Sequence, residues 1–431
     1  MLKYLWTVTQ DLFVTVTLVT LMHAVLVRLY GKFGRRFHGA GIIAGVLASA
    51  ALAAVKGTTN KIVSSRWNHH IYVFILAFTL AFVALALIVE RRREGVERPS
   101  LRGLLTAFAG TGLSATLIFY QLPGVMLYPF NFNTMGRGYL SSYYMVRMAG
   151  WLLALILLFV YSRLLYKCAV HIKPLAVVSG LLCAGALVNA AYCFGRFFAP
   201  WVNRAKWLGW SVRYTDEAYG WIGSWMMFTA NRSMVFIWLV FAVAVAVLAV
   251  CFMQNIRVTE PYDNPAQRRK LRAKNRGYRR RACTGLAGVL IFLCFLTVVK
   301  GYDTRVIELS APETFTVDGD RILVPMDAVN DFHLHRFEYR TENDVDVRWI
   351  VVRKPNSAAY GVGLDACDVC GNAGYYERSG QVVCRRCDVV MNINTIGFKG
   401  GCNPIPLSYE VEDGNLVFAM ADILAGEREF K

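Results

Sequence analysis

The chain has 431 residues, of which 56% are hydrophobic and only 18% are charged, a composition too apolar for an ordinary soluble protein. Its charge divides at Lys300: residues 1–300 hold 34 Lys and Arg against 8 Asp and Glu (net +26), whereas residues 301–431 hold 13 against 21 (net −8). The cations lie in short blocks between apolar runs, which argues against nucleic-acid binding and favours anionic lipid as the partner. We therefore expect a membrane domain over 1–300 and a separate domain over 301–431.

The membrane domain is expected to be a bundle of about eight helices. A bilayer core of ~30 Å needs about 17–25 apolar residues per helix. Eight stretches meet this requirement, roughly at residues 12–30, 39–56, 71–89, 103–122, 148–166, 174–195, 233–255 and 283–299. The first stretch lacks a basic leader and a small-residue cleavage site, so it is expected to remain as a span rather than to be removed as a signal peptide.

Basic residues predict the orientation of this bundle, because Lys and Arg near helix ends stay on the cytoplasmic side. They concentrate after the first, third, fifth and seventh spans, in "GKFGRRF", "ERRREGVERPSLR", "RLLYKCAVHIK" and "AQRRKLRAKNRGYRRRA". The intervening connections, around 57–70, 123–147 and 196–232, carry fewer cations for their length and are expected to face outward. The N-terminus and residues 301–431 are then both extracytoplasmic.

Few ionisable residues fall inside the predicted spans, where such groups usually face the bundle interior. His23 lies in the first span and His70 opens the third, at a different depth, so a haem held between them is less favoured than hydrogen-bonded or interfacial histidines. Asp11 is the only acid before Glu90. A cation pathway through the bundle would be expected to show more carboxylates.

Residues 301–431 change to a period of two and predict a small, mainly β domain. The predicted strands are "RVIELS", "TFTV", "RILVPM", "FHLHRFEYR", "VDVRWIVVRK", "QVVC", "PLSYEV" and "NLVFAM". Asp318-Gly319 and Asp413-Gly414 are hairpin dipeptides. Alternation places His333 and His335 on one face of a strand, where the pair is either an additional metal-ligand candidate or an exposed polar face.

Two CxxC pairs dominate the chemistry of this domain. Cys367 and Cys370 form the first pair and Cys384 and Cys387 the second, with the hairpin-like "YYERSGQVV" between them. Two such turns can bring four sulfurs into a tetrahedral array around one metal. Structural disulfides on an oxidising face are the competing interpretation, and the odd number of five clustered cysteines argues against complete pairing.

The fifth cysteine, Cys402, lies in "GFKGGCNPIPL", where the flanking glycines suit a backbone that loops closely around a metal centre. It is interpreted as a ligand that replaces one of the four, as a further thiolate, or as a surface thiol. The six other cysteines, Cys183 among them, are scattered singly in apolar segments and are expected to be small core residues.

The stretch "LDACDVCGNAGYYERSGQVVCRRCDVVMNINTIGFKGGCNPIPLSYEV" resembles the FtrD-like membrane iron-sulfur proteins of bacteria, with looser similarity at "HRFEYR" and "VRWIVVRK". The resemblance implies that Cys367, Cys370, Cys384, Cys387 and Cys402 hold an iron-sulfur cluster. The thiolates themselves would also suit mononuclear iron, with zinc as the alternative. The resemblance further implies a place in the bacterial cytoplasmic (inner) membrane beside an iron permease and a periplasmic iron-binding protein.

Three functions follow from these observations. The first is an electron-transfer or iron-handling component of bacterial iron uptake, which is a metal-binding component rather than a stand-alone enzyme. The second is a transporter or permease subunit whose external domain is stabilised by a structural zinc ion. The third is an integral-membrane quinone or ferric reductase, which would need haem-binding histidines or a quinone site.

Overall fold

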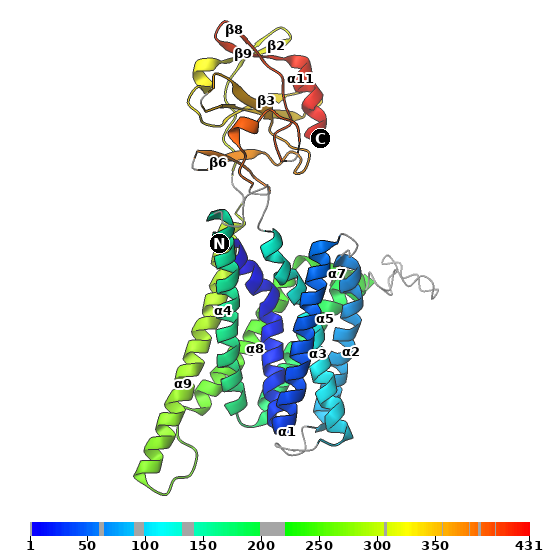
Figure 1. Cartoon of the computed structure of the whole chain (residues 1–431), viewed down its shortest axis with the longest axis vertical. Coiled ribbons are helices and arrows are strands. Elements are labelled where there is room, and N and C mark those ends of the chain that lie inside the picture. The colour runs from blue at the N-terminus through cyan, green and yellow to red at the C-terminus, as the bar shows by residue number, and fades with distance from the viewer. Residues whose placement is uncertain are drawn as a thin grey trace, which may run out of the picture. The chain divides into compact units, whose positions relative to one another are not determined.

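The structure is a computed structural model that describes residues 2–59, 64–89, 99–131, 142–198, 220–305, 308–355, 357–378, 380–386, 389–400 and 402–431. The chain forms two compact units, Met1–Thr304 and Arg305–Lys431, so that the division lies four residues after Lys300. The first unit is helical and the second is built mainly from short strands (Figure 1).

The helical unit is built from apolar helices that follow the predicted spans. The α-helices are α1 (Leu2–Thr58), α2 (Ser64–Val89), α3 (Leu101–Asn131), α4 (Ser142–His171), α5 (Leu175–Cys193), α7 (Gly220–Asn231), α8 (Ser233–Gln254), α9 (Pro265–Cys294) and α10 (Lys300–Asp303), with π-helical turns at Phe194–Phe198 and Phe295–Val299. Within the described residues, six helices are long and apolar enough to cross a membrane, and Ile71–Ala86 is a shorter apolar helix. This is the composition of a membrane protein.

Helix α1 contains the first two predicted spans and reverses direction between them. Gly31 has non-helical backbone angles (φ 52°, ψ −124°). The Nδ1 atoms of His23 and His38 lie 3.0 Å apart, whereas fifteen residues of a straight helix would separate the two residues by about 22 Å. The two limbs therefore form an antiparallel hairpin at Gly31, and Figure 1 shows them running alongside each other.

The basic segment before the last predicted span is helical rather than a loop. Helix α9 begins at Pro265, with the Asn264 side chain accepting a hydrogen bond from the Gln267 N–H (2.8 Å) and Gln267 accepting one from the Asp263 N–H (2.7 Å). This reciprocal cap, with proline at the first position, is a strong helix start. The Arg, Lys, Ala and Leu residues that follow favour helix, so the segment continues directly into the apolar part.

Three antiparallel sheets form the second unit. Strands β1 (Thr316–Asp318), β2 (Arg321–Pro325), β8 (Glu410–Glu412) and β9 (Asn415–Ala419) make a four-stranded sheet in the order β1-β2-β9-β8. Strands β3 (His335–Arg340), β4 (Asp346–Arg353) and β5 (Tyr360–Leu364) make the second sheet, and β6 (Tyr375–Arg378) with β7 (Gln381–Cys384) makes a hairpin. A short helix, α11 (Met420–Ala425), follows β9.

Strand β4 separates two hydrophobic cores. Trp349 and Val351 belong to a core shared with the four-stranded sheet, whereas Ile350 and Val352 belong to a second core that contains cysteines. Because successive strand residues point to opposite faces, a strand with both faces covered appears in the sequence as the continuous apolar run "WIVV". The cysteine-rich loops thus lie on the face of this sheet opposite the main core.

The strand predictions are confirmed in part. Both hairpin dipeptides connect paired strands, and Asp413 and Gly414 adopt the positive φ angles (45° and 78°) that such tight turns require. Strand β5, with the sequence YGVGL, was not predicted because its glycines conceal a strand pattern. In "RVIELS", residues 308–310 form no strand, and residues 306–307 lie outside the described residues.

The hairpin of α1 yields a testable prediction at Gly31. An L-residue at this φ and ψ is strained, so Gly31→Ala should lower the free energy of unfolding by about 1–3 kcal/mol. Gly39→Ala is the matched control, since a Cβ there meets no atom within 4 Å and its backbone is helical. Thermal unfolding of the detergent-solubilised chain measures both, and equal midpoints for the two variants would contradict the assigned turn.

Candidate metal centre

The first CxxC pair forms a tight turn directly after β5. The Cys367 N–H donates to the Gly371 carbonyl (3.1 Å), and the Gly371 N–H donates to the Cys367 carbonyl (2.9 Å). Gly371 has a φ of +64°, which favours glycine. Within the turn, the Cys370 N–H donates to Cys367 Sγ at 3.1 Å. A donor aimed at sulfur stabilises the thiolate form, which is the form that binds metals.

The second CxxC pair begins at the end of the β6–β7 hairpin. Cys384 is the last residue of β7 and pairs with Tyr375 on β6. The Cys384 N–H donates to the Val389 carbonyl (3.0 Å), and the Arg385 N–H donates to the Gly374 carbonyl (2.9 Å). The position of Cys384 is therefore set by the hairpin that the sequence predicted. Its partner, Cys387, lies outside the described residues.

The described cysteines of both segments meet in one core. Cys367, Cys370 and Cys384 are 2%, 5% and 1% exposed and share an apolar cluster with Tyr375. Cys402 is half-buried and packs against this cluster, and the Tyr375 hydroxyl donates to the Cys402 carbonyl (2.6 Å). Burial raises the pKa of Tyr375, as do the adjacent thiols of Cys367 and Cys384. The fold thus gathers four of the five candidate cysteines in one place.

Soft sulfur donors in an apolar environment suit a thiophilic centre such as an iron-sulfur cluster or zinc. For an iron-sulfur cluster, low exposure to water is one of the factors that set the reduction potential. Within the ranges that the structure describes, no three His, Cys, Asp or Glu side chains are spaced to hold a metal ion. The donor chemistry fits the predicted group, and the complete ligand set with Cys387 stays a prediction.

A buried ion pair positions both cysteine segments. Arg336 and Asp365 are 1% and 0% exposed, and Arg336 Nε donates to Asp365 Oδ2 at 3.0 Å. The other carboxylate oxygen accepts from the Tyr375 N–H (2.7 Å), and Arg336 also donates to the Tyr375 carbonyl. Burial raises the pKa of Asp365 while the Arg336 guanidinium opposes that rise. Asp365 precedes Cys367 by two residues and Tyr375 pairs with Cys384, so one carboxylate links the two segments.

Sequence reasoning missed Arg336 and Asp365. An arginine in a strand is expected at the surface, and nothing in its spacing marks it as buried. Arg336 also fastens the segment that precedes β1, because its Nη1 donates to the carbonyl (2.8 Å) and hydroxyl (2.6 Å) of Ser310. The Glu313 N–H donates in turn to the Arg336 carbonyl (2.7 Å).

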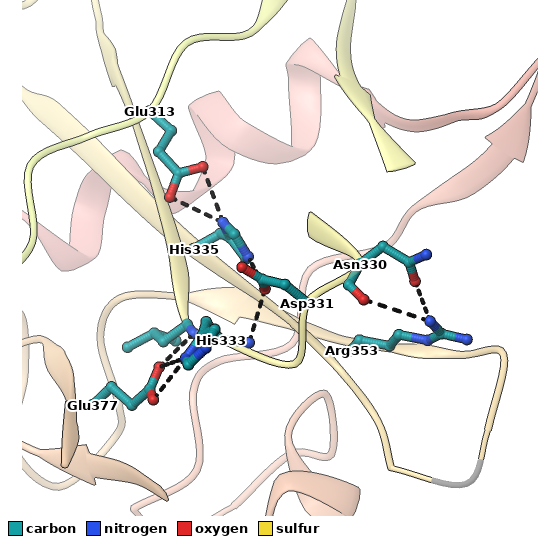
Figure 2. A network of polar contacts seen from close by, with 8 residues as sticks. Glu313, Asn330, Asp331, His333, His335, Arg353 and Glu377 are labelled. Carbon is teal, nitrogen blue, oxygen red and sulfur yellow. Dashed lines mark hydrogen bonds and ion pairs between the residues drawn. The ribbon is translucent and has the colours of Figure 1, made fainter. Parts of the chain in front are cut away.

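The predicted histidine pair lies in a separate polar network (Figure 2). His335 begins β3 and is 8% exposed, with Nδ1 3.0 Å from both carboxylate oxygens of Glu313 and Nε2 2.7 Å from Asp331. His333 lies before the strand, is 64% exposed and contacts Glu377 through Nδ1 (2.9 Å). Phe332, with a φ of 66°, interrupts the alternation that the sequence predicted. A metal role for His333 and His335 stays a prediction.

His23 and His38 of the helical unit contact each other directly. His23 Nδ1 and His38 Nδ1 are 3.0 Å apart, whereas two axial nitrogens on opposite sides of one iron, each at about 2.0 Å, would be about 4 Å apart. His38 Nε2 contacts the Ser114 hydroxyl at 2.8 Å. This is the hydrogen-bonded arrangement that the sequence favoured for His23. The side chain of His70 lies outside the described residues.

Comparison with known proteins identifies the C-terminal part. Residues 329–430 match a family model described as "Membrane iron-sulfur containing protein FtrD-like". These residues are similar to the FtrD-like family. The match confirms the family resemblance seen in the sequence, and the FtrD-like segment includes Arg336, Asp365 and all five clustered cysteines. Searches of curated proteins and of solved structures found no match to the chain.

Removing the buried carboxylate should strongly lower the free energy of unfolding of residues 305–431. Asp365→Asn leaves Arg336 buried without a counter-charge, which is expected to cost about 3–5 kcal/mol of the free energy of unfolding. Asp344→Asn breaks the exposed pair of Arg340 and Asp344 (64% and 78% exposed) and is expected to change the stability little, because water screens exposed ion pairs. Pulse proteolysis of the full chain in urea, following residues 305–431, distinguishes the two, and a similar loss in both would refute the central role of Asp365.

The histidine network predicts a pH dependence. Burial lowers the pKa of His335, but hydrogen bonds with Asp331 and Glu313 more than offset this and raise it overall. A raised histidine pKa stabilises the fold fully below the unfolded value of about 6.5, and this contribution is lost as pH rises through the folded pKa. For Asp331, burial raises the pKa, but hydrogen bonds from the His333 N–H and the His335 ring lower it overall, so its contribution is lost in acid.

The urea midpoint of residues 305–431 should therefore fall as pH rises above about 6.5 and also fall below about pH 4. His335→Gln should reduce the alkaline part of this dependence, and His333, whose pKa is raised by Glu377, supplies the remainder. Asn343→Gln is the control variant, because Asn343 lies in an exposed turn of the same domain and its side chain contacts Glu427 rather than a histidine. If the urea midpoint of His335→Gln still falls above about pH 6.5 as steeply as that of the wild type, groups other than His335 cause the fall.

Proposed function

We propose that this chain is a membrane-anchored iron-sulfur protein that serves electron transfer or iron handling in bacterial iron uptake. The observation that carries the proposal is the gathering of Cys367, Cys370, Cys384 and Cys402 around one buried cluster, inside the segment that matches a membrane iron-sulfur family. The apolar helices provide the membrane anchor. A single iron ion bound by the same thiols, in place of a cluster, is a variant of this proposal.

The residues that would hold the group are Cys367, Cys370, Cys384 and Cys387, with Cys402 as a further or replacing ligand. When bound, an iron-sulfur cluster supplies one-electron transfer at a potential set by hydrogen bonds to sulfur and by solvent exposure. The chain supplies both controls: the Cys370 N–H donates to Cys367 Sγ, and the apolar cluster limits access of water. Tyr375 acts as a positioning residue, since its hydroxyl holds the loop of Cys402.

The proposed location is the bacterial cytoplasmic membrane, with eight spans and an extracytoplasmic FtrD-like domain. The reversal of α1 at Gly31 supports two crossings within that helix, and the alternation of basic connections supports the orientation. An iron permease and a periplasmic iron-binding protein are the proposed partners, on the basis of the family resemblance alone.

A permease subunit with a structural zinc ion is the less favoured function. Zinc would satisfy four thiolates equally well, but it has no accessible redox change. Asp11, the one acid of the first ninety residues apart from Glu90, already accepts a hydrogen bond from the Tyr128 hydroxyl (2.5 Å). A pathway for multivalent cations would be expected to offer several inward-facing carboxylates.

The experiment is anaerobic purification of the full chain followed by absorption spectra and analysis for iron, acid-labile sulfide and zinc. Broad thiolate-to-iron absorption with iron and sulfide supports the proposal. A colourless sample that contains zinc supports the permease function, and a sharp Soret band supports a haem reductase.

Cysteine variants test the ligands within the same experiment. Cys384→Ser should abolish iron and sulfide retention, whereas Cys183→Ser, in the helical unit, should leave both unchanged. Full iron and sulfide in both variants would show that the ligand assignment is wrong. Cys402→Ser, measured in parallel, decides whether the fifth cysteine is a ligand.

A further inference from the structure

The helical unit contains a cavity of about 680 Å³ whose walls come from both limbs of α1, from α3 and from α4. Its size lies in the range of small-molecule sites in proteins. The wall on the first limb runs from Leu12 to His23, which is about 16 Å at the helical rise of 1.5 Å per residue. The cavity is thus elongated along the helices, as the binding site of an extended chain would be.

The two ends of this cavity differ in character. Leu12 and Val46 lie toward one end, far from Gly31 on each limb, and Ile118, Leu122 and Phe159 add apolar walls. His23 and Arg35 lie close to the Gly31 turn on their limbs, and Arg163 and Tyr166 join them from α4. The His23 and Tyr166 rings are 5.3 Å apart, which confirms that α4 meets α1 at this end. The cavity therefore has an apolar body and a cationic end.

The cationic end lacks a counter-charge in the part of the chain that the structure describes. The residues that line the cavity include Arg35 and Arg163 but no Asp or Glu. Both arginine side chains are exposed, and no ion pair to either occurs among the described residues. Two guanidinium groups that have no ion pair among the described residues, beside an apolar cavity, attract an anion, and phosphate accepts paired hydrogen bonds from arginine.

His23 is held at this end by contacts from the opposite limb. Its Nδ1 lies 3.0 Å from His38 Nδ1, and His38 Nε2 lies 2.8 Å from the Ser114 hydroxyl on α3. One Nδ1 must donate to the other, so the hydrogen-bonded pair fixes the orientation of the His23 ring at the cavity wall. The polar end is a preorganised set of groups from three helices rather than two isolated surface arginines.

We propose that this cavity binds one anionic phospholipid, with an acyl chain along the wall from His23 to Leu12 and the phosphate between Arg35 and Arg163. The predicted orientation places the "GKFGRRF" turn on the cytoplasmic side, where anionic lipids are enriched and where basic pockets between helices bind their head groups. A quinone has a similar apolar tail, but its carbonyl oxygens are neutral and do not compensate two cations. This site is separate from the proposed iron-sulfur centre and does not depend on it.

The test measures lipid binding by native mass spectrometry of the detergent-solubilised full chain, with dioleoylphosphatidylglycerol as the probe and dioleoylphosphatidylcholine as the neutral comparison. The wild type should retain the anionic lipid selectively. At about 1 kcal/mol per arginine, the double variant Arg35→Gln/Arg163→Gln should bind it about 30-fold more weakly. The control Arg269→Gln/Arg272→Gln removes the same charge from exposed positions of α9 and should bind within about twofold of the wild type.

A second variant tests whether the lipid occupies the apolar part of the cavity, without changing the charge. Thr20→Phe places a ring in the cavity wall and should also weaken retention of the anionic lipid, provided that the variant elutes as a monodisperse peak with unchanged helical circular dichroism. Equal binding by the wild type and the Arg35/Arg163 variant overturns the proposal, as does an equal loss in the α9 control, which would indicate a diffuse basic surface. Competition by decylubiquinone with no selectivity for the anionic lipid would assign the cavity to a quinone and also overturn it.

Discussion

The C-terminal domain depends on one buried carboxylate. The Asp365 side chain is fully buried, forms an ion pair with Arg336 and accepts a hydrogen bond from the Tyr375 N–H. Removing charges from water is costly, and the cost is offset only when the remaining hydrogen bonds are satisfied. Here the guanidinium donates to Asp365, Tyr375 and Ser310, so the pair is nearly fully satisfied. Such an arrangement tolerates few alternative positions of the strands, which is the property that a multi-cysteine site needs.

The same constraint explains how residues distant in the sequence acquire a common environment. Cys367 follows β5, Cys384 ends β7 and Cys402 lies in a later loop, yet all contact one apolar cluster beneath β4. Strand β4 contributes Ile350 and Val352 to this cluster and Trp349 and Val351 to the main core. A single strand therefore supports both the stability of the domain and the environment of its thiols.

Much of this organisation could be predicted from the sequence, because it rests on local patterns. Apolar length predicted the helices, the β-branched and aromatic run of "VDVRWIVVRK" predicted β4, and CxxC spacing predicted turns that carry sulfur. Features that depend on tertiary contact were missed. The burial of Arg336 requires the carboxylate of Asp365, which lies just after β5. The contact of His23 with His38 was also missed, although the two predicted spans joined by a turn at residues 31–37 place these residues on neighbouring limbs. The helical start of α9 was overlooked because its charge suggested a loop, although Asn264 and Pro265 are recognisable capping residues.

The attachment of residues 308–313 has a mechanical consequence. Ser310 and Glu313 follow closely after the last helix of the membrane unit and bind Arg336 and His335, the first two residues of β3. The guanidinium that holds this tether is the one that holds the carboxylate beside Cys367. A force transmitted along residues 308–313 would thus reach the cysteine turns in part through the Arg336 side chain, so this segment and the thiol cluster are mechanically coupled.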